Sequence, residues 1–134
     1  KGMQKNDERF LGEGIVVHGE IENAQDFMQL HGVMLVPVFA AGGIRVKMLE
    51  AFAGGIPVIS TTVGVQGIPA LHERQLLIAD TPEAFAAAML RLQSEPVLGK
   101  ELLLNAQNLI AEHFDARALI KGLMSFYEDF KCIK

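Results

Sequence analysis

The segment FAAGGIRVKMLEAFAG (residues 39–54) contains residues whose types and spacing suit a chemical role. Gly42 and Gly43 lie just before Arg45 and Lys47, which open a stretch of helical composition. The N-terminus of a helix already carries positive partial charge, so a cation in the first turn costs roughly 0.3–1 kcal/mol at the surface. A bound anion would reverse that cost, because the free N–H groups and both cations would attract it. The segment therefore predicts an anion site.

The chemistry of these residues suits a nucleoside diphosphate. Glycines let a ligand approach the main chain closely, while the forked donors of Arg45 and the point charge of Lys47 suit phosphate oxygens. Glu50 lies about two turns beyond the glycines, and one carboxylate can accept hydrogen bonds from both hydroxyls of a ribose. A plainer interpretation stays open at this point: Lys47 and Glu50 can pair on a solvated helix face, and the two glycines can form an ordinary loop.

Other polar residues give weaker signals. The GxxxxGK[ST] and GxGxxG nucleotide fingerprints are absent. Four histidines fit neither HxxxH nor HExxH spacing, so we expect no metal site; they are His18, His31, His72 and His113. His18, at the end of a predicted strand, suits either a structural or a catalytic role. Ser60, Thr61 and Thr62 suit either phosphate binding or a turn at a strand end.

Four short apolar runs rich in β-branched residues are predicted as the strands that position these residues. They cover residues 15–18, 33–38, 56–61 and 75–79. The runs are nearly continuous rather than alternating, which indicates strands buried on both faces. Ligands of parallel sheets bind beyond the carboxyl ends of the strands. That rule selects the loops at residues 18–23, 38–45 and 61–69.

Helices are predicted between and after the strands from their caps and their apolar periodicity. They are expected at residues 23–31, 45–53, 81–92, 102–114 and 115–130. Asn23 is the expected cap of the first, with Asp26 placed to complete a capping box. Thr81 caps the third, with Pro82 in its first turn, and Asp115 caps the last. The apolar stripes of the last three helices are expected to pack against the sheet.

Strands that alternate with helices predict an α/β fold, a Rossmann-like parallel sheet flanked by helices, in a single domain over residues 1–134. The formal net charge is −4 without a basic stripe, which argues against general affinity for nucleic acid. The apolar runs are too short to span a bilayer. The single cysteine, Cys132, cannot form an internal disulfide, which favours a reducing, cytoplasmic location.

The segment PVFAAGGIRVKMLEAFAGGIPVISTTVGVQGI (Pro37 to Ile68) strongly resembles the donor-binding segment of GT-B glycosyltransferases of the large retaining group four. The family pattern is a strand ending in Pro, a Gly-rich loop, a helix with LEAxAxGxPV, and then xTxxGG. The flanking segments IVVHGEIENAQDFMQLHGVMLVPV and LLIADTPEAFAAAMLRLQ, and the closing helix to FYEDF, also look like the family. The resemblance therefore covers nearly the whole chain.

The resemblance implies a hexosyltransferase-type enzyme. Such an enzyme transfers a sugar from a nucleotide diphosphate sugar to an acceptor with retained anomeric configuration, and the nucleotide sugar is its donor substrate rather than a cofactor. Glu50 matches the ribose-binding glutamate, Gly43 and Ile44 match backbone positions facing the diphosphate or donor sugar, and Gly19 and Ile21 match the region lining the nucleobase pocket. The two cations belong to a GGxRxK variant and are assigned to phosphate binding by their charge. The expected donor-binding residues are Gly42, Gly43, Ile44, Arg45, Lys47, Glu50, Gly19 and Ile21.

Two departures from the family pattern affect these expectations. Many members carry a glutamate eight residues before the ribose-binding one, where it contacts the donor sugar; here that position is Gly42. GT-B enzymes also have two Rossmann-like domains around a cleft, and this chain resembles only the later part of the C-terminal one. We therefore expect a partial nucleotide-sugar-binding domain that lacks its N-terminal acceptor domain, with catalytic groups outside the chain and no transfer activity in isolation.

Two other functions fit the sequence less well. A sugar-nucleotide epimerase can share the GT-B architecture, but it would need further acid–base residues, and the sequence offers no convincing set. A non-catalytic, receiver-like α/β interaction module would need an acidic cluster after the first strand, where Gly19-Glu20 stand.

The family indicates a role in surface glycan (polysaccharide) biosynthesis. The cytoplasm is the expected location, and contact of a full-length enzyme with the inner face of the membrane stays open.

Overall fold

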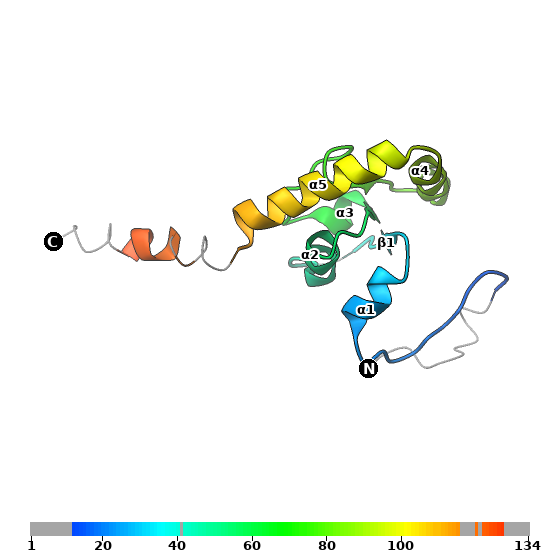
Figure 1. Cartoon of the computed structure of the whole chain (residues 1–134), viewed down its shortest axis with the longest axis horizontal. Coiled ribbons are helices and arrows are strands. Elements are labelled where there is room, and N and C mark those ends of the chain that lie inside the picture. Colours follow the sequence, from blue (N-terminus) through cyan, green and yellow to red (C-terminus); the bar gives the residue numbers. More distant parts are fainter. Residues whose placement is uncertain (1–11, 41, 116–119, 121, 128–134) are drawn as a thin grey trace.

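The computed structural model describes residues 12–40, 42–115, 120 and 122–127. Its sheet has three parallel strands, β1 (Met34–Val36), β2 (Val58–Ser60) and β3 (Leu77–Ile78), in the order β1-β2-β3. The register sets Leu35 opposite Ile59, and Ile59 opposite Leu77. Strands that follow one another in the chain are neighbours in the sheet, with helical connections between them (Figure 1). The parallel α/β architecture predicted from the sequence is confirmed.

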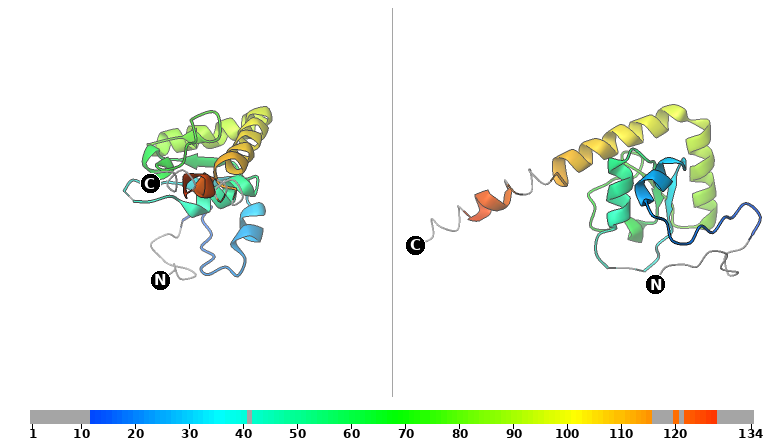
Figure 2. Two further views of the ribbon diagram at one scale, coloured as in Figure 1. Left: turned by 90° about the vertical axis from the view of Figure 1, so that its left-hand side faces the viewer. Right: turned by 60° about the horizontal axis from the view of Figure 1, so that its bottom comes forward.

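Alternate residues of β2 point to opposite faces of the sheet, and each face is covered by a helix. Val58 packs in a core cluster with Met48 and Phe52 of α2 (Val46–Ala53). Ile59 packs in a second cluster with Phe85 of α4 (Pro82–Ser94). The two helices lie on opposite sides of the sheet in Figure 2. This double burial explains why β2 is buried on both faces. At the edge of the sheet the prediction of strands buried on both faces is wrong for β1, where Leu35 is 43% exposed.

The last long helix, α5 (Pro96–His113), joins the two faces. Its buried Leu102 belongs to the cluster on the α4 side, while its buried Ala106 and Leu109 belong to the cluster on the α2 side. The helix accordingly contacts both α2 and α4. The predicted packing of the stripe at residues 102–114 is confirmed.

The predicted caps are present at two helices. The side-chain oxygen of Asn23 accepts hydrogen bonds from the backbone N–H groups of Gln25 and Asp26 at the start of α1 (Ala24–Gln29). Asp26 does not complete a capping box through the backbone, because its carboxylate accepts instead from the Asn23 side-chain amide at 2.7 Å. Thr81 accepts from the backbone N–H of Ala84 at 3.2 Å and thus caps α4.

Two predictions about the ends of the chain are wrong. Residues 15–18 form no strand: Ile15 and Val16 are 55% and 74% exposed, and no strand among the described residues pairs with them. An apolar segment forms a β-strand only when a neighbouring strand accepts and donates its backbone hydrogen bonds. Residues 122–127 are helical, yet their apolar side chains are exposed and the helix lies beyond the end of α5, away from the sheet (Figure 1). The predicted start of that helix, at residues 116–119, lies outside the described residues.

Candidate functional site

The loops that follow β1 and β2 are joined at the carboxyl edge of the sheet. A short helix that the sequence did not predict, α3 (Thr62–Val65), forms most of the second loop. The Thr61 hydroxyl donates to the carbonyl of Val38 and accepts from the backbone N–H of Gly64. Thr61 therefore caps α3 and ties it to the end of β1. A helix of four residues is too short to show an apolar periodicity. The N-cap residue Thr61 was therefore the only feature of the sequence that could have indicated it.

Gly42 and Gly43 present open backbone at this edge. Gly43 has φ +79°, a left-handed conformation that costs other residues roughly 1–2 kcal/mol. A Cβ built on either glycine would meet no atom within 4 Å. The backbone freedom predicted for this pair is thus used at Gly43, and the space above both residues is free for a ligand.

Arg45 stands at the N-cap of α2, and its guanidinium turns back onto the loops. One terminal nitrogen donates to the carbonyls of Gly42 (3.0 Å) and Gly43, and the other donates to the carbonyl of Val63 in α3 at 3.4 Å. Its Nε is buried without a hydrogen-bond partner. The side chain therefore holds the glycine loop against α3, a role that its charge alone did not indicate. No side chain caps the N-terminus of α2, so the anion-attracting end of the helix stays open.

Lys47 and Glu50 form an ion pair on the first turns of α2. Lys47 Nζ lies 2.7 Å from Glu50 Oε2, and the two side chains are 60% and 42% exposed. Exposed pairs of this kind contribute about 0–1 kcal/mol. The two side chains therefore pair on a solvated helix face in this structure, as the plainer interpretation of the sequence had it. The pair is weak enough for a ligand to displace.

The two remaining donor-site candidates lie in a different loop. Gly19, with φ +73°, and Ile21 precede α1, and α1 packs against α2. Among the described residues, no hydrogen bond joins Gly19 or Ile21 to the segment from Gly42 to Glu50. The structure thus brings six of the eight predicted residues together on one loop and helix, and it leaves Gly19 and Ile21 in the neighbouring loop.

Sequence reasoning missed Asp80, which follows β3 at the same edge. Its carboxylate accepts from the hydroxyl and the backbone N–H of Thr62, both at 2.7 Å. These hydrogen bonds, that of the hydroxyl first, lower the pKa of Asp80. Its position directly after the predicted strand at residues 75–79 could have marked Asp80 as a candidate, because site residues of parallel sheets follow the strand ends. Asp80 fixes α3 from the β3 side.

The other polar residues at this edge have structural partners. Ser60 and Thr61 are fully buried, and Ser60 donates to the carbonyl of Thr61 at 3.1 Å. Together with the bond from Thr62 to Asp80, this favours the turn role over phosphate binding. His18 stacks edge-to-face on Phe27, with ring centroids 4.8 Å apart.

Within the described part of the chain, no three His, Cys, Asp or Glu side chains are grouped so that they could hold a metal ion. None of the described helices is both long and apolar enough to cross a membrane.

Comparison with known proteins identifies the relatives of this fold. A family model described as "Glycosyl transferases group 1" matches residues 2–95. An "Uncharacterized 44.6 kDa protein in cps region" of Klebsiella pneumoniae is 26% identical over 91 residues, which are 68% of this chain and 24% of that protein. The chain therefore spans about a quarter of the length of this relative.

Two solved structures share the architecture. Sucrose-phosphate synthase from Thermosynechococcus elongatus superposes with a TM-score of 0.67 at 22% identity, over 81% of this chain and 27% of that one. The C-terminal domain of a glycosyl transferase group 1 family protein from Francisella tularensis gives a TM-score of 0.62 at 16% identity, over 73% and 52% of the two chains. These similarities confirm the fold class expected from the sequence.

Proposed function

The chain belongs to the glycosyl transferases group 1 family, and we propose that it is the donor-binding portion of a retaining glycosyltransferase that uses a nucleotide diphosphate sugar. One observation carries the proposal: the open, left-handed glycine at position 43 leads into the uncapped N-terminus of α2. Backbone N–H groups and the helix dipole favour a diphosphate at such a place.

Each predicted residue has a stated task in this proposal. The backbone of Gly42, Gly43 and Ile44 faces the diphosphate, and Lys47 turns from Glu50 to its oxygens. Glu50, once released, accepts from the ribose hydroxyls. Arg45 keeps the glycine loop in place through its carbonyl contacts and adds positive charge beneath the phosphates. Gly19 and Ile21 line the space for the nucleobase.

The wider role is proposed from the relatives. The Klebsiella pneumoniae relative is named for its place in a cps region, and this supports a role in surface glycan biosynthesis, in the cytoplasm. The sugar would pass to an acceptor held by a second domain. We expect this chain by itself to bind donor without transferring sugar, because the opposing wall of the active site belongs to that second domain.

The test is a titration of the 134-residue chain with UDP, GDP and ADP, followed by NMR at the backbone amides of residues 42–47, with inorganic diphosphate as the partial ligand. At least one nucleotide should shift these amides and bind more tightly than inorganic diphosphate, because only the nucleotide engages Glu50. Glu50→Gln should weaken nucleotide binding about tenfold, the effect of losing a charged hydrogen-bond partner, and should leave diphosphate binding no weaker, because Lys47 no longer has to leave the carboxylate. Glu101→Gln, an exposed position on α5, is the matched control. Unmoved amides with all three nucleotides would refute the assignment.

A further inference from the structure

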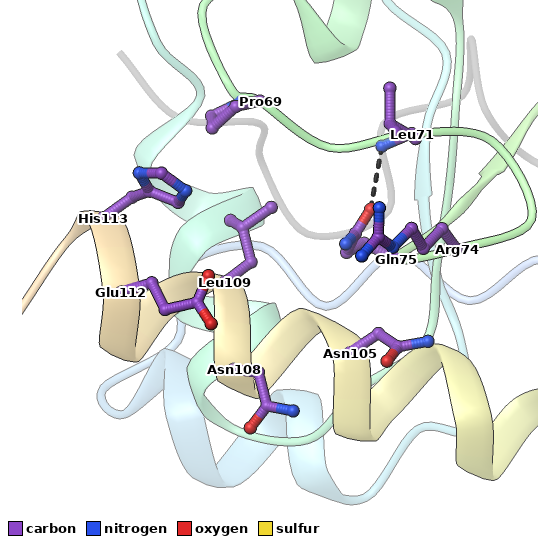
Figure 3. A pocket seen from close by; sticks show the side chains of 9 residues that line it. All are labelled: Pro69, Leu71, Arg74, Gln75, Asn105, Asn108, Leu109, Glu112 and His113. Carbon is purple, nitrogen blue, oxygen red and sulfur yellow. Dashed lines mark hydrogen bonds between the residues drawn. The ribbon is translucent and has the colours of Figure 1, made fainter.

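A polar pocket lies at the opposite edge of the sheet from the donor loops. Its walls are the loop at residues 69–75, which leads into the amino end of β3, and the C-terminal half of α5 (Figure 3). Because the strands are parallel, their amino ends lie on the far side of the sheet from Gly43 and α3. The pocket is open to solvent and has a volume of about 220 Å³.

The floor of this pocket is a buried amide with a free donor. Gln75 is only 8% exposed, and its Oε1 accepts from the backbone N–H of Leu71 at 2.9 Å. That bond fixes the amide orientation, because the opposite orientation would set two donors against each other. The Nε2 group has no acceptor among the described residues, and it points into the hollow between the loop and α5 in Figure 3. This donor is open to the pocket rather than sealed in the core, so a ligand there can accept its hydrogen bond.

The rest of the lining is polar, and its formal charges cancel. Arg74 and Glu112 carry one charge of each sign, and neither side chain forms an ion pair or a hydrogen bond within the described residues. Carboxamides of Asn105 and Asn108 and the ring of His113 add further free donors and acceptors. The remaining lining residues offer a small apolar surface: Pro69, Leu71 and Leu109.

This lining favours a neutral ligand that both donates and accepts hydrogen bonds. A small anion would gain from Arg74 but would face the carboxylate of Glu112. A hydroxyl group can accept from Nε2 or the guanidinium and donate to the carboxylate, and the C–H face of a sugar ring can rest on the leucines. We propose that this pocket is a second, non-catalytic site for a single pyranose unit. It is independent of the donor site, on the other edge of the sheet.

The site can be observed directly through its own side chains. The 134-residue chain is titrated with methyl α-D-glucopyranoside, methyl α-D-galactopyranoside and methyl α-D-mannopyranoside, and the side-chain NH₂ signals of Gln75, Asn105 and Asn108 are followed by NMR. At least one glycoside should shift all three signals with a dissociation constant on the order of 1–10 mM, as expected for a ligand of so few atoms. UDP should shift the amides of residues 42–47 and leave these signals in place, so each site is tested separately.

Two variants separate binding from folding. Gln75→Glu keeps an acceptor for the Leu71 N–H but removes the free donor, and it should weaken the glycoside about tenfold. Gln107→Glu, on α5 but outside the lining, should bind as the parent does. If Gln75→Glu unfolds, Asn108→Ala at an exposed position replaces it with the same expectation. Unmoved signals with all three glycosides, or signals that move with sodium phosphate alone, would overturn the proposal.

Discussion

Gly64→Ala should destabilise the protein although it improves intrinsic helix propensity. Gly64 lies in α3 against the carboxyl ends of β1 and β2. A Cβ at this position would stand well under 3.0 Å from the hydroxyl of Ser60, 3.1 Å from that of Thr61 and 3.2 Å from the carbonyl of Val36. Ser60 and Thr61 are fully buried, so neither hydroxyl can swing into solvent. The methyl group must therefore push α3 away from the sheet.

The expected size follows from two opposing terms. Overpacking a buried contact costs about 1–3 kcal/mol, and replacing Gly by Ala in a helix returns up to about 1 kcal/mol. We expect a net loss of about 1–2 kcal/mol in the free energy of unfolding, measured by urea denaturation with circular dichroism. Gly99→Ala in α5 is the control, since its Cβ meets nothing within 4 Å. That variant should gain about 0.5–1 kcal/mol from propensity alone.

A double-mutant cycle identifies the cause. Ser60→Ala removes the hydroxyl that the new methyl group meets, at the expense of the single hydrogen bond to the Thr61 carbonyl. In that background Gly64→Ala should cost less, by about 1 kcal/mol or more, as couplings between touching residues do. Additive effects of the two substitutions, or a Gly64→Ala variant as stable as Gly99→Ala, would refute the predicted clash with Ser60. Either result would also contradict the close packing of α3 against the sheet.

Two further predictions concern the same edge of the sheet. The pKa of Asp80 is lowered in the folded protein by its bonds to Thr62, so its stabilising contribution is present above the unfolded value of 3.8 and is lost as the pH falls through the folded value. The stability difference between the parent and Asp80→Asn should therefore shrink at acid pH in a urea series, and a difference independent of pH would contradict this assignment. Arg45→Lys keeps the charge but cannot reach the loop carbonyls together; it should shift the backbone amides of Gly43 and Val63 without any ligand and cost about 1 kcal/mol. Unmoved amides would contradict the bracing role, and Lys47→Arg is the control that should leave them in place.

The sequence predicted those parts of the fold that local chemistry determines. Asn23 and Thr81 cap helices because their side chains reach N–H groups two or three residues away, and apolar runs marked the three strands of the sheet. The run at residues 15–18 has the same composition, but no strand of the described residues pairs with it. A strand depends on its neighbour, and composition does not reveal whether the neighbour is there.

In the candidate site, too, the sequence predicted the features that depend on neighbouring residues and missed the contacts between distant ones. The open glycine at position 43 was predictable, because glycine spacing is local. The start of the following helix was predicted one residue early, at Arg45, which the structure places at the N-cap of α2. The contact of Arg45 with Val63 was not, because it joins residues eighteen positions apart. The short helix α3, which supplies that contact, has too few residues for a periodic signal. Charge alone therefore assigned Arg45 to the ligand, whereas its neighbours in space show that it also orders the loop.

These contacts also explain how two cations can stand at the positive end of a helix before any ligand is bound. The terminal nitrogens of Arg45 donate to loop carbonyls, which no ligand needs to displace. Lys47 is neutralised by Glu50, in an exposed pair that is cheap to break. A ligand that took only Lys47 would leave Glu50 unpaired, and one that took only Glu50 would leave Lys47 unpaired. The ligand that replaces this pair without loss must offer an anion and hydroxyl donors a few bonds apart, and a nucleoside diphosphate has both on one molecule.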